Sequence, residues 1–263
     1  MSVLRSRDNP RVRRWHALSH DGRARRDERC ALLEGAHLIG AYLDSGARPR
    51  SLLVSESGRH KAEIAALVQR AGIAPVTLPD ALFRWLADAA SPAGLAAEIE
   101  IPAVAASQPA TGDCVFMESI QDAGNVGAIL RSAAAFGVRH AVLERGCADP
   151  WSPKALRAAM GGHFSLSIGE AEDLPAVLGR FRGTLICTVA RGGRPLAELE
   201  LAGDAGWIFG AEGQGVSAPV ASLAAVHATI PLAPDAESLN VAAAAAICFY
   251  ERARRLSTRD ARS

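Results

Sequence analysis

Apolar and polar residues recur along the first hundred residues in short blocks that are typical of a small α/β domain. Helical spacings of apolar residues predict helices over residues 11–20, 23–46, 61–72 and 79–88. Short apolar runs predict strands at 51–55, 74–78 and 94–101. Helices and strands that alternate in this way indicate an α/β fold for this part of the chain.

The stretch PAVAASQPATGD (residues 102–113) combines proline, serine and glycine with no hydrophobic period, which indicates a linker. We therefore expect a first domain over residues 1–105, a linker over 106–112 and a second domain over 113–263. Beyond the linker, strands are expected at 114–118, 140–144, 164–169, 184–190, 207–210 and 226–232. Helices are expected up to about residue 136, at 152–162, at 173–181 and at 238–256. This pattern predicts a parallel sheet flanked by helices.

Positive charge is segregated at the two ends of the chain. The 263 residues carry a net charge of +1, but residues 1–29 hold nine arginines against four acidic residues, and residues 252–263 hold five against one. The ends thus carry +5 and +4, which leaves −8 for residues 30–251. Such asymmetry suits a polyanion such as RNA, although solvated basic tails would look the same. The candidate RNA-binding residues are Arg11, Arg13, Arg14, Arg25 and Arg26.

Cysteine usage and hydropathy exclude several classes of protein. The five cysteines are odd in number and show no Cys-x-x-Cys or Cys/His ligand spacing, so disulfides and a structural metal are not expected. The longest apolar run (residues 241–250) is half of the roughly 20 residues that span a bilayer. The N-terminus has no apolar signal core. We expect a cytoplasmic protein that uses neither membrane nor metal.

Arg131 is a lone charge within the small and apolar segment IQDAGNVGAILRSAAAFG (residues 120–137). Asn125 is suited to cap the helix expected here. On that helix Arg131 shares a face with small residues such as Gly127 and Ala134. A buried unpaired charge is costly. Arg131 should therefore pair with a carboxylate, or its face should form a ligand cleft.

The segment WIFGAEGQGVS (residues 207–217) places three glycines around Glu212 at the end of an expected strand. A glycine turn in this position lets the backbone approach a ligand at the carboxyl edge of a sheet. Gly210, Gly213 and Gly215 match neither a Walker motif nor Gly-x-Gly-x-x-Gly. Glu212 would repel a polyphosphate, and it suits a cationic or hydroxyl-bearing ligand or a salt bridge to Arg131. A purely structural turn is the alternative.

The segment IPLAPDAESLNVAAAAA (residues 230–246) joins a strand to the last helix. Ser238 and Asn240 are good helix starters, so capping alone would explain them. The five alanines allow another helix to approach closely. Because all three segments follow strands in the same half, they should gather at one edge of the sheet.

The three segments together resemble the SpoU (TrmH) family of RNA ribose 2′-O-methyltransferases, within the SPOUT superfamily. The first family motif, Asn-x-Gly-x-x-x-Arg, matches Asn125, Gly127 and Arg131. The second, Gly-x-Glu-Gly-x-Gly, matches the turn around Glu212. The third, Ile-Pro-(Met/Leu) followed by Ser-Leu-Asn-Val, matches the segment from Ile230 to Val241. The first half is similar to the family's ribosomal-protein-like substrate-binding domain. Ala159 and Ala242 stand where serine is usual, and a glutamine often found before Gly94 is absent.

The resemblance implies a C-terminal parallel-sheet domain with a trefoil knot, preceded by the RNA substrate-binding domain. It also implies an S-adenosylmethionine site and a homodimer with active sites near the interface. The cofactor-binding residues would be Gly210, Ile230, Leu232 and Leu239. The catalytic residues would be Arg131, Asn125, Glu212, Ser238 and Asn240, with Glu212 pairing with Arg131.

The implied reaction is methyl transfer from S-adenosylmethionine to a ribose 2′-hydroxyl in RNA. Among substrates we favour 23S ribosomal RNA, because the first half resembles the ribosomal-RNA branch of the family, and transfer RNA is the alternative. A non-catalytic RNA-binding protein on the same scaffold is the second reading. An α/β enzyme acting on a small metabolite is the third, although it leaves the basic ends without a use.

Overall fold

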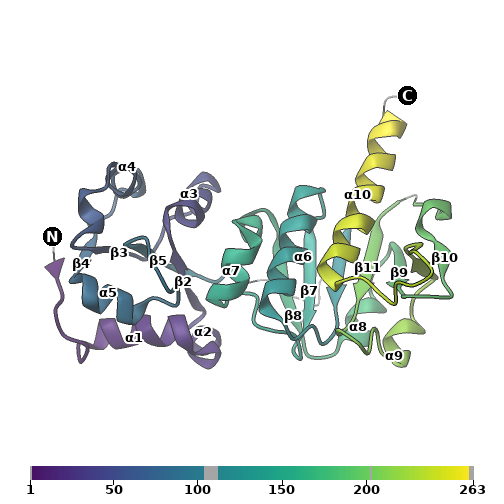
Figure 1. The fold of residues 1–263 in the computed structure, drawn as a ribbon, viewed down its shortest axis with the longest axis horizontal. Coiled ribbons are helices and arrows are strands. Elements are labelled where there is room, and N and C mark those ends of the chain that lie inside the picture. Colours follow the sequence, from purple (N-terminus) through teal and green to yellow (C-terminus); the bar gives the residue numbers. More distant parts are fainter. Residues whose placement is uncertain (1, 104–111, 202, 261–263) are drawn as a thin grey trace. The chain divides into compact units, whose positions relative to one another are not determined.

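The computed structural model describes residues 2–103, 112–201 and 203–260, which form two compact units (Figure 1). The N-terminal unit contains the described residues up to Pro102 together with Asp149–Phe164. The C-terminal unit contains the described residues of Ala103–Ala148 and Ser165–Ser263. The segment Asp149–Phe164 thus belongs to the second half of the sequence but packs with the first.

The N-terminal unit is built on a five-stranded sheet with strand order β1-β4-β3-β5-β2. The strands are β1 (Ser2–Val3), β2 (Cys30–Glu34), β3 (Ser51–Ser55), β4 (Val76–Leu78) and β5 (Leu95–Glu100). Strands β1, β4 and β3 pair in parallel, whereas β5 runs antiparallel to both β3 and β2. The sheet is therefore mixed, and β5 is the strand through which β2 joins it.

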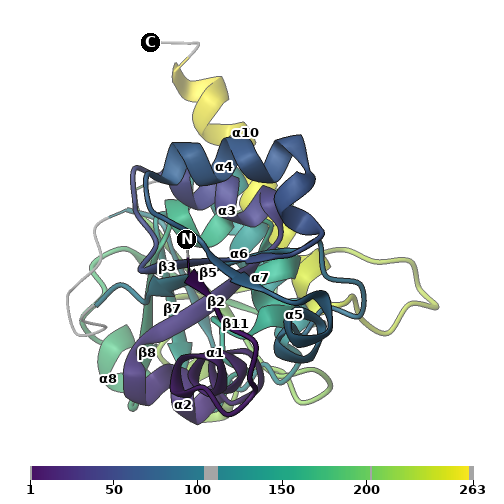
Figure 2. The ribbon, with the colours of Figure 1, turned by 90° about the vertical axis from the view of Figure 1, so that its left-hand side faces the viewer.

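Helices cover both faces of this sheet. They are α1 (Pro10–His20), α2 (Gly22–Glu28), α3 (Ala36–Asp44), α4 (Ala62–Ala71) and α5 (Asp80–Leu86), with a short 3₁₀ helix at Gly58–His60. Figures 1 and 2 show α3 and α4 on one side and α1, α2 and α5 on the other. Apolar residues of α1 and α5, such as Trp15 and Phe83, pack with strand residues such as Leu53 in one core.

The long helix expected over residues 23–46 is wrong, because a strand interrupts it. Helix α2 ends at Glu28, its cap Arg29 has a left-handed φ of 50°, and Cys30–Glu34 then forms β2. Five residues of β2 pair with β5 from Cys30↔Glu100 to Glu34↔Ala96. The backbone hydrogen bonds and the burial gained in the sheet outweigh the tendency to form a helix that the spacing of apolar residues from Leu32 onward indicates.

The segment Asp149–Phe164 is fixed to the N-terminal unit by polar and apolar contacts. Its helix α7 (Pro153–Ala159) packs against β2. Arg25 Nε lies 2.7 Å from Asp149 Oδ2, and both side chains are largely buried. The ring of Phe164 packs edge-on against Tyr42, with centroids 5.1 Å apart. This segment is therefore a structural part of the N-terminal unit.

The C-terminal unit is built on a seven-stranded sheet with strand order β10-β12-β9-β11-β6-β7-β8. Every strand pair that the structure describes in this sheet is parallel. The strands are β6 (Cys114–Met117), β7 (His140–Glu144), β8 (Ser167–Ala171), β9 (Thr184–Thr188), β10 (Arg194–Pro195), β11 (Ala205–Phe209) and β12 (Val226–Thr229). The parallel α/β fold expected for this half is confirmed.

Four α-helices are described in the C-terminal unit: α6 (Ala123–Ala135), α8 (Leu174–Leu178), α9 (Ala218–Ala221) and α10 (Val241–Asp260), besides a 3₁₀ helix at Leu196–Glu198. Alternate residues of the central strands face opposite sides. Phe116 and Ile208 join the core that contains α8 and α9. Trp207 and Phe209 instead contact Phe249 of α10, which packs beside α6. The helices expected near 173–181 and 238–256 are thus present with shorter or shifted bounds.

In the described parts of the chain, no helix is long and apolar enough to cross a membrane. No group of three or more His, Cys, Asp or Glu side chains among the same residues is placed to hold a metal ion. All five cysteines are free.

Candidate active site

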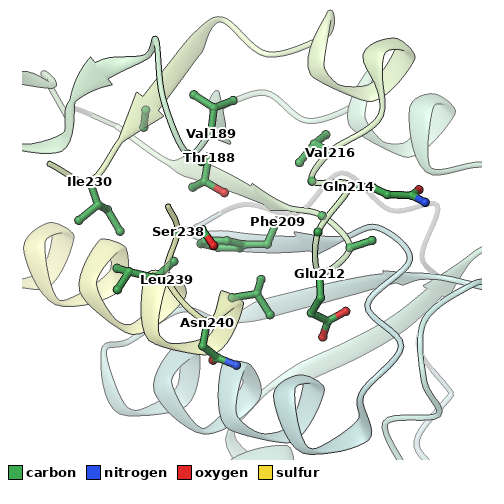
Figure 3. A pocket seen from close by; sticks show the side chains of 18 of the residues that line it. Thr188, Val189, Phe209, Glu212, Gln214, Val216, Ile230, Ser238, Leu239 and Asn240 are labelled. Atoms are coloured by element: carbon green, nitrogen blue, oxygen red, sulfur yellow. The ribbon is translucent and has the colours of Figure 1, made fainter. Parts of the chain in front are cut away.

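A cavity of about 660 Å³ opens at the carboxyl ends of three neighbouring strands of the C-terminal unit (Figure 3). Its walls are the ends of β9, β11 and β12 and the start of α10. The lining includes Thr188, Val189, Phe209, Gly210, Glu212, Gly213, Gly215, Val216, Ile230, Leu232, Ser238, Leu239, Asn240 and Val241. The carboxyl edge of a parallel sheet thus gathers the second and third sequence segments around one space, as expected.

The glycine turn after β11 can be built only from glycine at its critical positions. A Cβ at Gly210 would overlap the backbone of Gly215. Gly213 and Gly215 have φ values of 88° and 70°, which side chains disfavour. The Gly215 N–H donates to the Ala211 carbonyl at 2.9 Å and closes the turn. The turn therefore brings bare backbone to the cavity wall.

Three side chains that are distant in sequence form one hydrogen-bonded chain beside the cavity. Asn240 Nδ2 donates to Asn125 Oδ1 at 3.0 Å. Asn125 Nδ2 in turn donates to Glu212 Oε1 at 2.6 Å. These bonds fix which end of the Asn125 amide points to which neighbour, because only oxygen accepts and only nitrogen donates. The first, second and third segments are therefore joined through Asn125.

Two helix caps support this arrangement. Asn240 Oδ1 accepts the backbone N–H groups of Ala242 and Ala243 at 2.9 and 3.2 Å, so Asn240 caps α10 as expected. The cap of α6 is Asp122, which accepts the Asn125 N–H at 3.0 Å. The expectation that Asn125 would cap α6 is wrong. Because Asp122 takes that role, the Asn125 side chain is free to bridge Asn240 and Glu212.

Glu212 is held ionised by its neighbours. Partial burial by itself would raise the pKa of its carboxyl, but hydrogen bonds from the Asn125 amide and from backbone N–H groups, including that of Gln121, outweigh burial and lower the pKa. The carboxylate is thus negatively charged at neutral pH. It places that charge at the rim of the cavity.

Within the described part of this chain Arg131 neither pairs with a carboxylate nor faces the cavity, the two positions that we expected. It is exposed on α6, does not line the cavity, and makes no hydrogen bond or ion pair with the described residues. Within this chain Glu212 bonds to Asn125 and not to Arg131, so the expected Glu212–Arg131 pair does not form among its described residues. A guanidinium left free on the surface remains available to a partner outside this chain.

Sequence reasoning missed a buried carboxylate, Glu118, that bonds to the chain just after the glycine turn. Glu118, at the end of β6, is 7% exposed and accepts the Ser217 backbone N–H at 2.7 Å and the Ser217 hydroxyl at 2.5 Å. These bonds tie the chain just after the turn to the neighbouring strand. The signal that could have revealed Glu118 is a single acidic residue that ends an otherwise apolar strand.

The cavity wall formed by the end of β9 was also missed. Thr188 Oγ1 donates to the Ile208 carbonyl at 2.9 Å and so links this end to β11. The carboxyl-end rule would have pointed to Thr188 and Val189, but no motif marked them.

The five candidate RNA-binding arginines separate into two groups. Arg11, Arg13 and Arg26 are exposed. Arg25 is 5% exposed and donates to Asp149 and to the backbone carbonyls of Leu18 and Ser19, so it does not belong to the exposed basic surface.

Arg14 is engaged in the same structural way. It pairs with Glu28 and, at 2.7 Å, with Glu98, a buried carboxylate that also accepts the Trp15 indole N–H. Only part of the N-terminal charge thus faces solvent without a partner.

Comparison with known proteins decides the family. The SpoU rRNA Methylase family model matches residues 113–250, which is more than half of the chain, and the MRM3-like substrate binding domain model matches residues 9–97. The chain belongs to the SpoU rRNA methylase family. The resemblance drawn from the three motifs is thereby confirmed.

Relatives of this SpoU family member are similar along nearly its whole length. An uncharacterized tRNA/rRNA methyltransferase of Synechocystis sp. is 33% identical, with 97% of this chain and 94% of the relative covered. The 23S rRNA (guanosine(2553)-2'-O)-methyltransferase RlmP of Bacillus subtilis is 30% identical, with 95% and 98% covered. The crystal structure of an AdoMet-bound rRNA methyltransferase from Sinorhizobium meliloti has a TM-score of 0.83 at 25% identity and covers 97% of this chain and 98% of that one.

Proposed function

We propose that this protein is an S-adenosylmethionine-dependent methyltransferase that modifies a ribose 2′-hydroxyl of ribosomal RNA, with 23S rRNA as substrate. The observation that carries the proposal is the Asn240–Asn125–Glu212 chain beside a glycine-walled cavity in a SpoU family member. Relatives named as rRNA methyltransferases, one with AdoMet bound, support both cofactor and substrate class.

The cavity suits S-adenosylmethionine in size and lining. Its volume of about 660 Å³ lies within the range of small-molecule sites. Backbone at Gly210 and the apolar side chains of Ile230, Leu232 and Leu239 would hold the adenosine end. The Glu212 carboxylate suits a positively charged sulfonium. When bound, S-adenosylmethionine would supply an electrophilic methyl group.

The polar residues would position the ribose. Asn125 and Asn240 each use one side-chain N–H in the hydrogen-bonded chain, and each retains a second N–H that can reach a ribose oxygen. Ser238 lines the same cavity and offers a hydroxyl. Because the amides are already held in place, little reorganisation is needed when the RNA arrives.

Arg131 would bind the target phosphate and stabilise the alkoxide that forms as the 2′-hydroxyl loses its proton. A guanidinium stays protonated up to a pH of roughly 12 or more, so we assign it an electrostatic role and not that of a base. Since Arg131 does not line the cavity of its own chain, this role needs a second subunit.

We propose a homodimer that buries the α6 and α10 surface. Helix α10 exposes Ile247 (39%) and Tyr250 (54%), and Tyr250 contacts Phe136 at the end of α6. Exposed large apolar side chains on α10 and an exposed arginine on the neighbouring α6 suit an interface between subunits. Such a dimer would bring Arg131 of one subunit toward the cavity of the other. The trefoil knot and a cytoplasmic location, both implied by the family, stay predictions.

Two measurements test the proposed function. Calorimetry should show S-adenosylmethionine binding, and labelled methyl groups should appear in 23S rRNA incubated with the protein. Mapping 2′-O-methyl groups in RNA from cells with and without the gene would then identify the nucleotide. Methylation of transfer RNA alone would replace the substrate, and RNA binding without cofactor binding would favour the non-catalytic reading.

A further inference from the structure

A cluster of planar side chains lies on the α1 and α5 side of the N-terminal unit. The rings of His16 and Trp85 are stacked, with centroids 3.9 Å apart and an interplanar angle of 15°. The Arg7 guanidinium lies over the Trp85 ring at 5.0 Å, and the His20 ring lies 4.4 Å from that of His16. We call Arg7, His16, His20 and Trp85 the ring cluster.

The ring cluster is at the surface and not in the core. The buried side of α1 is formed by residues such as Val12, Trp15 and Leu18, whereas Arg7 and His20 are exposed and His16 and Trp85 are half-buried. Burial, together with repulsion from His20 and Arg7, lowers the pKa of His16. The His16 ring is thus neutral at pH 7, and its stacking needs no charge.

Two arginines without carboxylate partners among the described residues accompany the rings. Arg7 and Arg13 make no ion pair or side-chain hydrogen bond with the described residues, unlike the paired Arg14 and Arg25. Arg13 lies three positions before His16 and seven before His20, so it shares their face of α1. Guanidinium groups without carboxylate partners remain available to phosphate.

We propose that the ring cluster and Arg13 bind an unpaired nucleotide of the RNA substrate, an inference that rests on the proposed function. Unpaired bases stack on aromatic rings and on guanidinium planes, and the adjacent phosphate needs a free cation. This surface offers both within one unit. The charge of +5 over residues 1–29 adds attraction for the RNA backbone. An acidic peptide would use the arginines but has no need of the flat ring surfaces.

The test measures RNA binding by the full chain, with fluorescence anisotropy of a labelled hairpin that has an unpaired loop and of a fully paired RNA duplex. Trp85→Leu keeps an apolar side chain and removes the stacking ring. It should weaken hairpin binding about tenfold or more, and duplex binding much less. Arg13→Gln should weaken both and lower the salt dependence by about one phosphate contact.

Arg70→Gln is the charge control, because it removes the same side-chain charge from α4, where Arg70 pairs with Asp44 on the opposite face of the sheet (Figure 2). It should change hairpin affinity less than about twofold. Arg7→Gln leaves the His16–Trp85 stack in place and covers the case in which Trp85→Leu does not fold. Unchanged hairpin binding by folded Trp85→Leu and by Arg7→Gln, or equal losses for hairpin and duplex, would overturn the proposal.

Cofactor binding separates this inference from the proposed function. Calorimetry with S-adenosylmethionine should give the same affinity for Trp85→Leu and the wild type, because Trp85 belongs to the other unit. If hairpin binding depends on Trp85 but no methyl transfer occurs, the ring cluster stands and the enzymatic function fails. If methyl transfer occurs but hairpin binding does not depend on Trp85, the enzymatic function stands and the proposal for the ring cluster fails.

Discussion

The side chain of Asn240 donates a hydrogen bond to the side chain of Asn125 at 3.0 Å, although 115 positions separate them in the chain. Asn125 in turn donates a hydrogen bond to the carboxylate of Glu212. One amide thus joins the helix after β6, the turn after β11 and the start of α10.

Replacing Asn125 by aspartate should impair methyl transfer in a pH-dependent way. Asn125→Asp would place a second carboxylate beside Glu212, which accepts at 2.6 Å in the wild type. Like charges at this distance raise the pKa of one carboxyl, so the pair is repulsive at neutral pH and shares a proton in acid. We expect kcat to fall at least about tenfold at pH 7.5 and to recover partly below about pH 6. Asn125→Ala is the control, and it should be impaired without recovery in acid.

Removing the carboxylate of Glu118 should weaken cofactor binding. Glu118→Leu would remove the charged acceptor of the Ser217 backbone N–H, and a hydrogen bond to a charged group typically contributes about 1.5–3 kcal/mol. Because Ser217 follows the glycine turn, we expect the Kd for S-adenosylmethionine to rise about 5- to 100-fold in calorimetry. Ser217→Ala keeps the backbone hydrogen bond and should have a smaller effect. Equal affinity of Glu118→Leu and the wild type would show that the turn does not need this tether.

Stability should depend on pH through His163. Burial lowers the pKa of this fully buried ring to about 4, although its hydrogen bond to the Pro150 carbonyl and the charge of Asp149 act in the opposite direction. In the unfolded chain the pKa is about 6.5. As the pH falls, the unfolded state therefore binds a proton to this ring before the folded state does. The stabilising contribution of neutral His163 is complete above about pH 6.5 and is lost as the pH falls towards 4. The loss amounts to about 3 kcal/mol.

The comparison with His163→Gln isolates this contribution, because glutamine keeps a donor for Pro150 but does not titrate. Urea unfolding should show that the unfolding free energy of the wild type falls more than that of the variant as the pH is lowered from 6.5 to 4. A constant difference over this range would mean that His163 is already solvated in the folded state.

Activity should be restored by mixing two inactive subunits. If Arg131 acts in the cavity of the partner, dimers that combine an Arg131→Ala subunit with a Glu212→Ala subunit contain one complete site. Random pairing then recovers about a quarter of the wild-type activity. Co-expression with two different tags and purification on both would isolate the mixed dimer. Lack of activity in that dimer, with each tagged wild-type dimer active, would place the action of Arg131 within its own chain.

Local sequence patterns determined the class of fold and the membership of the site. Glycine spacing around Glu212 and the helix starters before the last helix pointed to positions that line the cavity, because a tight turn and a helix cap depend on adjacent residues. The order of strands and helices likewise sufficed for a parallel α/β sheet. The family motifs added the cofactor and the reaction.

Pairing across the chain was decided only by the tertiary structure. Residues 30–34 became a strand because β5 lies beside them, and Asn125 became a bridge because Asp122 had taken the cap. The sequence made Arg25 a candidate RNA ligand, but in the structure it pairs with Asp149, which lies 124 positions further along the chain. Long-range contacts of this kind depend on which segments fold against each other, and a spacing pattern within one segment carries no information about a partner that lies outside it.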